Sequence, residues 1–172
     1  MTWQNLLEMD WKISGRLRIA EKPGLLRTTA AILAHSGDSW FWLLALLIVW
    51  WFGVEYWKLR AIVLIEAILF LAVSVFAIKL LVRRKRPEGE WGGIYRITDP
   101  HSFPSGHAAR AVLITVIVLG LGPAWLAIAC LIWMPLVCLA RIAMGVHYAS
   151  DVLAGGLLGL LAGIGGLLFL PF

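Results

Sequence analysis

Charged residues are scarce in this chain. They make up 15% of its 172 residues, whereas hydrophobic residues make up 61%. An ordinary soluble domain carries about 25% charged and roughly 45–50% apolar residues. A single domain of this length has too little interior to hide so much apolar surface from water. The composition therefore excludes an ordinary soluble domain and predicts that lipid is the solvent for much of the chain.

Acidic residues and cysteines are also few. The ten Asp and Glu residues form no cluster suited to Mg²⁺, so we expect neither a metal nor another cofactor. The two cysteines, Cys130 and Cys138, lie eight residues apart in one apolar run. Because that spacing is about two helical turns, they are too far apart to form a disulfide within one helix. We interpret them as buried thiols.

Apolar runs of nearly membrane length dominate the chain. Five runs approach or reach the ~20 residues that cross a bilayer as a helix. They cover roughly residues 39–54, 61–82, 106–120, 124–143 and 151–170. Residues 2–22 and 25–36 instead mix apolar with basic side chains, which is typical of helices that lie at the membrane interface.

The predicted fold is therefore all-α: a polytopic membrane helix bundle of about five transmembrane helices, preceded by amphipathic helices. We expect one membrane domain over residues 1–172, with the interfacial helices in 1–38 and the bundle in 39–172. Two polar connections, 83–105 and 144–150, are separated by two spans, so they fall on the same membrane face.

The chemistry of these connections centres on His147. Beyond Pro104 the charged residues are Arg110, Arg141 and Asp151, and ionisable groups near membrane segments are by default functional. His147 and Asp151, at i and i+4, share a helix face if the helix extends that far. The carboxylate can then accept the Nδ1 proton and leave Nε2 nucleophilic. An interfacial histidine explains His147 alone, but not its charged neighbours.

A second group of candidates follows the span that ends near residue 82. Lys79 and Arg86 are seven residues apart, two helical turns, so both could point the same way off the end of that helix. Two cations suit the spread charge of a phosphate group. The run from Arg83 to Arg86, taken alone, favours instead a basic flank that anchors the helix at anionic headgroups.

A third group, Pro104-Ser105-Gly106-His107, opens a helix after the polar loop. Backbone N–H groups at a helix N-terminus bind anions. Ser105 adds a hydroxyl, and Gly106 permits close approach of the backbone. His107 lies in the first turn, where it can give a proton to a leaving oxygen. Helix capping alone explains Ser-Gly-His equally well.

Together these residues resemble the three-part signature of the type 2 phosphatidic acid phosphatase family, in the right order and at the expected spacings. The three parts are Lys79-x6-Arg86-Pro87, Pro104-Ser105-Gly106-His107 and Arg141-x5-His147-x3-Asp151. Small bacterial membrane lipid phosphatases are the members that the spans resemble. The family usually has serine before the arginine of the third part. This chain has Ala140 there, so we expect weaker phosphate binding without loss of activity.

The resemblance implies a mechanism. His147 attacks phosphorus and forms a phosphohistidine, Asp151 holds the tautomer of that histidine, and His107 protonates the leaving group and then activates water. The transferring phosphoryl group is stabilised by Lys79, Arg86, Ser105, the Gly106 N–H and Arg141.

The expected substrate is a phosphorylated lipid, because the site lies at the membrane face. Phosphatidic acid, phosphatidylglycerol phosphate, a polyprenyl diphosphate and a lipid A phosphate all fit. A lipid phosphotransferase on the same fold and a non-enzymatic transporter are the alternatives, and a vanadium haloperoxidase is disfavoured because those enzymes are soluble. Nucleic acid is a poor partner, since the basic residues adjoin membrane segments.

Two arguments disagree about which side of the membrane the active site faces. The N-terminal Lys and Arg residues would put the active-site face in the cytoplasm by the positive-inside rule. Resemblance to the bacterial lipid phosphatases puts it outside. We favour a multi-pass cell-membrane protein with an extracytoplasmic site, because the loop cations are needed by phosphate.

Overall fold

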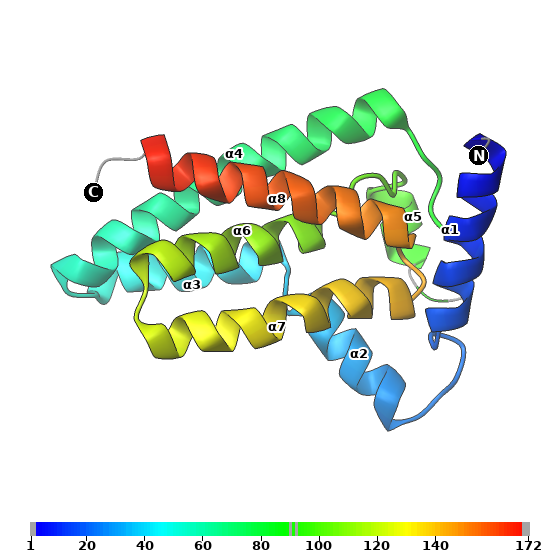
Figure 1. The fold of residues 1–172 in the computed structure, drawn as a ribbon. Coiled ribbons are helices and arrows are strands. Elements are labelled where there is room, and N and C mark those ends of the chain that lie inside the picture. The colour runs from blue at the N-terminus through cyan, green and yellow to red at the C-terminus, as the bar shows by residue number, and fades with distance from the viewer. Residues whose placement is uncertain (1–2, 90, 92, 170–172) are drawn as a thin grey trace.

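The structure is a computed structural model, and it describes residues 3–89, 91 and 93–169. Within these residues the chain forms eight helices, which confirms the all-α prediction. They are α1 (Trp3–Leu17), α2 (Leu25–His35), α3 (Ser39–Phe52), α4 (Glu55–Val82), α5 (Gly93–Thr98), α6 (Gly106–Leu121), α7 (Ala124–Ala143) and α8 (Ala149–Phe169). Helices α3, α4, α6, α7 and α8 run lengthwise through the molecule, and α1 lies across one end of them (Figure 1).

By helix length, the structure has fewer candidate membrane spans than the five apolar runs indicate. In the described chain, α4, α7 and α8 are each long and apolar enough to cross a bilayer. A fourth candidate arises if α2 and α3, which meet at a bend of 57°, form one broken span. All five runs are helical, but α3 has 14 residues and α6 has 16, fewer than the ~20 of a straight span.

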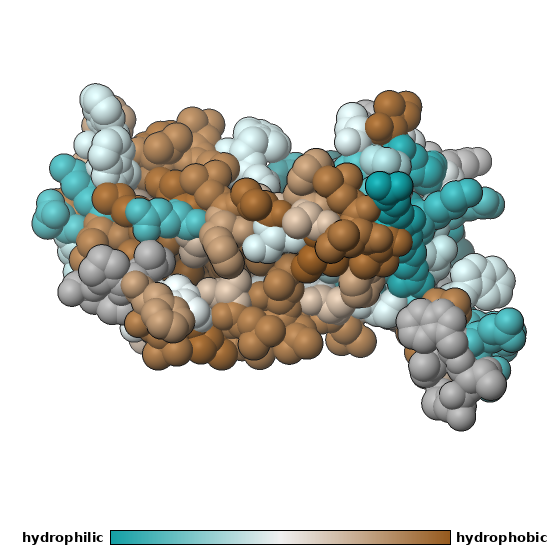
Figure 2. Space-filling model, turned by 90° about the horizontal axis from the view of Figure 1, so that it is seen from above, coloured by the Kyte–Doolittle hydropathy of each residue, from teal (hydrophilic) through white to brown (hydrophobic). Residues whose placement is uncertain are grey.

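The surface matches a bilayer environment. Apolar side chains cover the middle of the face seen in Figure 2, and polar side chains gather toward its two ends. Large apolar residues that are exposed include Phe70, Val73 and Leu161. A soluble protein would not leave such a continuous apolar band in water. The chain is therefore a membrane protein with several apolar helices.

Helix α4 begins earlier than the sequence suggested. The second apolar run starts at residue 61, but Glu55, Lys58 and Arg60 before it already form the first turns of α4. An acidic residue such as Glu55 stabilises a helix N-terminus. Arg60 donates to the carbonyl oxygen of Leu121 at 2.5 Å, at the C-terminal end of α6. The guanidinium of Arg60 is thus satisfied while the helix continues.

Helix α2, which the sequence predicted to lie at the interface, packs against α7. Ala30 and Ala34 of α2 are buried in one cluster with Ala140 and Met144. The small side chains allow the two helices to approach closely, and α2 therefore contributes to the wall of the bundle.

Helix α8 packs most closely on α6, and glycines make this possible. A side chain at Gly155 would collide with the carbonyl oxygen of Ser105, and one at Gly159 with that of Ala109. Stripes of small residues let membrane helices come into backbone contact. The first turn of α6 is therefore fixed against α8, near the end of the bundle that α1 covers.

Candidate active site

The two polar connections meet at this end of the bundle, as the spacing of the spans predicted. Arg86 Nη1 donates to the carbonyl oxygen of Val146 at 2.9 Å. The same nitrogen lies 3.2 Å from His147 Nε2. Residues 60 positions apart are thus in direct contact beside the candidate nucleophile.

Lys79 and Arg86 converge, but not in the way that their spacing suggested. Helix α4 ends at Val82, and Arg83 adopts a left-handed conformation with φ of 51°. Arg86 therefore does not share a helix with Lys79, and the prediction that both project from one helix end is wrong. Both side chains nevertheless reach Oδ2 of Asp99, Arg86 Nη2 at 2.7 Å. A carboxylate that the motifs did not indicate thus neutralises this pair of cations.

His147 is held by an acceptor that differs from the predicted one. Its Nδ1 lies 2.8 Å from the carbonyl oxygen of Ser102, whereas Oδ2 of Asp151 is 3.7 Å away. The expected hydrogen bond from Nδ1 to Asp151 is therefore absent between these two described residues, because α8 begins at Ala149 and His147 precedes it. A proton on Nδ1, donated to this carbonyl oxygen, would place the lone pair on Nε2, which lies 3.2 Å from Arg86 Nη1.

The surroundings of His147 favour its neutral form. Only 1% of its surface is exposed. Burial lowers the pKa of His147 well below its usual range, and the positive charges of Arg141, Arg86 and Lys79 lower it further. A neutral imidazole is the form that can attack phosphorus.

Asp151 lies behind His147 and is fully buried. Its Oδ2 accepts a hydrogen bond from the backbone N–H of Tyr148 at 2.9 Å, and its Oδ1 accepts one from Arg84 Nη1 at 2.7 Å. Arg84 also donates to Asp10 of α1 at 2.8 Å. The sequence distinguishes Arg84 in no way from the other residues of its basic run, so this role could not be foreseen.

Most of the predicted site residues line one cavity of about 300 Å³. Six of the eight line it: Lys79, Arg86, Gly106, His107, Arg141 and His147. Ser105 lies at the N-cap of α6, where its hydroxyl accepts from the N–H of Ala108 at 3.5 Å. The cavity also has an apolar wall from α4, formed by Ile68, Leu71, Ala72, Val75 and Phe76.

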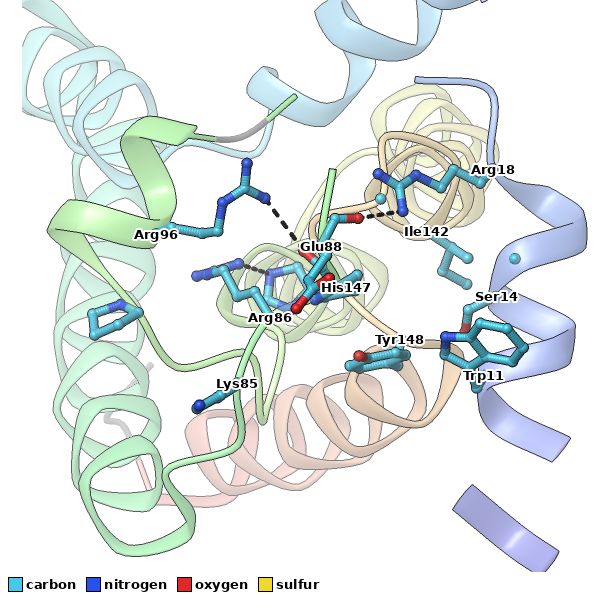
Figure 3. A pocket seen from close by; sticks show the side chains of 14 residues that line it. Trp11, Ser14, Arg18, Lys85, Arg86, Glu88, Arg96, Ile142, His147 and Tyr148 are labelled. Atoms are coloured by element: carbon cyan, nitrogen blue, oxygen red, sulfur yellow. Dashed lines mark hydrogen bonds between the residues drawn. The ribbon is translucent and has the colours of Figure 1, made fainter. Parts of the chain in front are cut away.

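His147 also lines a second, outer pocket of about 840 Å³ (Figure 3). Trp11 and Arg18 line it from the α1 side, and Arg96 of α5 lines it from the opposite side. Arg18 Nη1 donates to the carbonyl oxygen of Glu88 at 2.5 Å. Figure 3 shows His147 and Arg86 between these two walls, and both residues also line the inner cavity.

His107 and Arg110 contact the turn between α2 and α3. His107 Nε2 lies 2.5 Å from Oδ1 of Asp38. Arg110 donates to the carbonyl oxygen of Gly37, which explains a buried arginine that the motifs left without a role. Ala140, where the family has serine, lies in the buried cluster between α2 and α7.

A bundle of apolar helices with a cation-rich cavity at its polar end defines a class: membrane proteins that bind a phosphate-like anion next to imidazole groups. Comparison with known proteins gives the family. Residues 56–171 match the model of the PAP2 superfamily. The chain therefore belongs to the PAP2 superfamily, and it is an integral-membrane lipid phosphatase of that family. The family that the three motifs indicated is thus confirmed.

Individual relatives agree with this family. The chain is 33% identical over 147 residues to decaprenylphosphoryl-5-phosphoribose phosphatase of Mycobacterium tuberculosis, covering 84% of this chain and 80% of the relative. A transmembrane PAP2 type phosphatidylglycerolphosphate phosphatase from Bacillus subtilis has a similar structure. The TM-score is 0.79 at 22% identity, over 94% of this chain and 84% of that one. LpxE of Aquifex aeolicus gives a TM-score of 0.70 at 27% identity, covering 94% and 93%.

Proposed function

We propose that this protein hydrolyses a phosphate monoester or diphosphate on a lipid through a covalent phosphohistidine at His147. The main support is the inner cavity, which brings His147 and His107 together with Lys79, Arg86 and Arg141. Three cations beside two imidazoles suit a reaction in which negative charge spreads over phosphoryl oxygens.

In the first step, the substrate phosphate replaces the Asp99 carboxylate between Lys79 and Arg86. His147 Nε2 attacks phosphorus, and the bond from phosphorus to the lipid oxygen breaks. His107 gives its proton to that oxygen. The His147 ring becomes positive, and it is stabilised by the Ser102 carbonyl oxygen at 2.8 Å and by the Asp151 carboxylate at 3.7 Å.

In the second step, His107 takes a proton from water, and the resulting hydroxide attacks the phosphohistidine. The bond between phosphorus and Nε2 breaks, phosphate leaves, and both histidines return to their starting forms. We propose that no metal ion takes part, because the side-chain cations and the N–H groups at the start of α6 supply the positive charge that a phosphoryl group needs.

The substrate is a lipid phosphate whose tail lies along the apolar wall that α4 contributes to the inner cavity. The relatives act, by their names, on a decaprenylphosphoryl phosphoribose and on phosphatidylglycerol phosphate. Phosphatidic acid, phosphatidylglycerol phosphate, a polyprenyl diphosphate and a lipid A phosphate are therefore the substrates to test first.

We further propose that residues 1–172 act as one membrane domain. Helix α1, expected only to lie at the interface, contributes Asp10 to the hydrogen bonds around Asp151 and Arg84. It also lines the outer pocket with Trp11, and Arg18 lines it just after the helix ends.

A panel of these lipids, incubated with purified protein in detergent, tests the proposal. Inorganic phosphate should be released from at least one of them. His147→Ala should abolish that release while retaining the helical circular dichroism of the wild type. Adding an acceptor lipid separates hydrolysis from phosphotransfer, since transfer would yield a new phospholipid in place of free phosphate. Full activity of His147→Ala would refute the nucleophile.

A further inference from the structure

Asp38 lies in the short turn between α2 and α3, outside the residues 56–171 that match the family model. We infer that Asp38 is the positioning residue of His107: its carboxylate orients the ring and stabilises the protonated form that the leaving group needs. This inference rests on the proposed function.

The first support is the geometry of the carboxylate. Asp38 Oδ1 lies 2.5 Å from His107 Nε2, and Oδ2 lies 3.3 Å from Nδ1 of His35. Asp38 occupies the N-cap of α3, where aspartate normally accepts a hydrogen bond from the helix. Within the described chain its carboxylate makes no such capping bond. The side chain gives up a stabilising local contact and contacts the histidine instead.

The second support is the way in which the turn is held. Trp42 Nε1 donates to the Ser36 carbonyl oxygen at 2.9 Å, and Trp133 Nε1 donates to Ser36 Oγ at 2.8 Å. Arg110, one turn after His107 on α6, donates to the Gly37 carbonyl oxygen. Side chains from α3, α7 and α6 thus hold the three residues of this turn. A simple connection between two helices does not require so many contacts.

Gly37 brings this turn close to the histidine. A Cβ at this position would lie 3.3 Å from Cδ2 of His107 and 3.3 Å from Cγ1 of Val137. A residue without a side chain is therefore suited to the point where the turn meets the first turn of α6.

The third support is that His107 needs a nearby negative charge to hold its proton. A general acid must carry a proton before it acts. Arg110 and Arg141 line the same cavity as His107, and like charges disfavour a protonated imidazole. Asp38 supplies the opposite charge next to the ring. His147, the nucleophile, has the opposite requirement, and its nearest acceptor is the neutral carbonyl of Ser102.

The test compares two substrates that differ in their need for a proton. An alkyl phosphate such as phosphatidic acid has a poor leaving group, whereas the nitrophenolate of an amphiphilic nitrophenyl phosphate departs without protonation. We expect Asp38→Asn to lower kcat/KM for the alkyl phosphate by about 10²-fold, the low end of a general acid's contribution, and that for the nitrophenyl phosphate by under about threefold. His107→Ala should show the same selectivity, and His147→Ala should lose both activities.

Two further variants keep the test decisive. Asp38→Glu retains the carboxylate and should recover most of the activity on the alkyl phosphate. Glu8→Gln removes an exposed carboxylate on α1, which pairs with Lys12 at 3.9 Å, and should match the wild type on both substrates. Equal losses on both substrates in Asp38→Asn and Asp38→Glu, or no loss in Asp38→Asn, would overturn the inference. A wild type that releases phosphate from no lipid of the panel would instead refute the proposed function, and this inference with it.

Discussion

Two histidines divide the proposed chemistry, and their surroundings differ in charge. His147 contacts a neutral carbonyl oxygen through Nδ1 and a guanidinium beside Nε2. His107 contacts a carboxylate. A nucleophile must be neutral and a general acid must be protonated, so the nearest acceptor of each ring suits its proposed task.

The depressed pKa of His147 leads to a prediction about pH. Burial, Arg141, Arg86 and Lys79 all lower that pKa, so the ring stays neutral as the pH falls through the usual range of histidine. We expect the acidic limb of kcat/KM to lie below about pH 6.5. Arg86→Gln removes one of the lowering charges and should move the limb to higher pH, besides weakening binding.

Arg83→Gln is the matched control, because Arg83 belongs to the same basic run but is exposed and donates to the Leu80 carbonyl oxygen. Its pH profile should coincide with that of the wild type. Ionisation of the substrate is common to all three proteins and cancels in the comparison. A limb that shifts equally in both variants would contradict this account of His147.

Asp99 leads to a second prediction at the scale of single residues. Its carboxylate occupies the cations that the substrate phosphate would need. Asp99→Asn should therefore tighten inhibition by orthovanadate, a phosphate analogue. The effect should be up to about fivefold, because a partly exposed ion pair is worth about 0.2–1 kcal/mol. Glu88→Gln, an exposed carboxylate in the same connection, should leave inhibition unchanged, and weaker inhibition of Asp99→Asn would show that Asp99 is not a competitor.

At the scale of helices, the N-terminus of α8 is capped by residues of α1. Ser14 Oγ accepts from the N–H of Ala149 at 2.9 Å, and Asp10 Oδ1 accepts from that of Ser150 at 3.0 Å. Caps of this kind normally come from the helix itself or the residue before it. Helix α1 is thereby attached to the segment that carries His147.

Removal of the Asp10 cap should destabilise the protein. Asp10→Ala should lower the stability by about 1–2 kcal/mol, since loss of a cap costs about 0.5–2 kcal/mol and Arg84 also loses a partner. The midpoint of denaturant-induced unfolding in detergent measures this change. Glu8→Ala, on the exposed side of the same helix, should have little effect, and equal stability of both variants would contradict the capping role.

The glycines of α8 give a prediction about activity. Gly155→Ala would push the helix away from the Ser105 carbonyl oxygen and displace the first turn of α6. Because a displacement of about 1 Å can cost on the order of 10²-fold in rate, we expect at least about a tenfold loss of kcat. Gly165→Ala, a position with open space around it, should be neutral. Equal activity of the two variants would mean that this contact does not position the site.

Much of the helical arrangement could be predicted because apolar runs and their polar boundaries are local features. Six of the eight site residues could also be predicted from the sequence, and these six line the same cavity. Ser102, Asp99, Arg84 and Asp38 could not be predicted, because each acts through a contact with a residue distant in the chain. The bend that joins α2 to α3 is likewise set by packing, so neither helix could be assigned its membrane position from composition.

At the scale of the whole molecule, the proposed site lies at one polar end of an apolar band (Figure 2). We propose that this end faces outward. A cysteine at position 88, in the outer pocket, should react with a membrane-impermeant maleimide in intact cells, whereas Lys58→Cys in the first turns of α4 should react only after lysis. The reverse pattern would place the proposed site in the cytoplasm.

The central claim is that the phosphoryl group passes through His147, and trapping that intermediate tests it most directly. The protein is mixed with a lipid phosphate that it cleaves, quenched in alkali to preserve phosphohistidine, and digested for mass spectrometry. We predict one phosphoryl group on His147 in the wild type and none in His147→Ala. A phosphoryl group on any other residue would contradict the account. So would turnover without a trapped phosphoryl group, if oxygen-labelled water and a chiral phosphate show a single inversion at phosphorus.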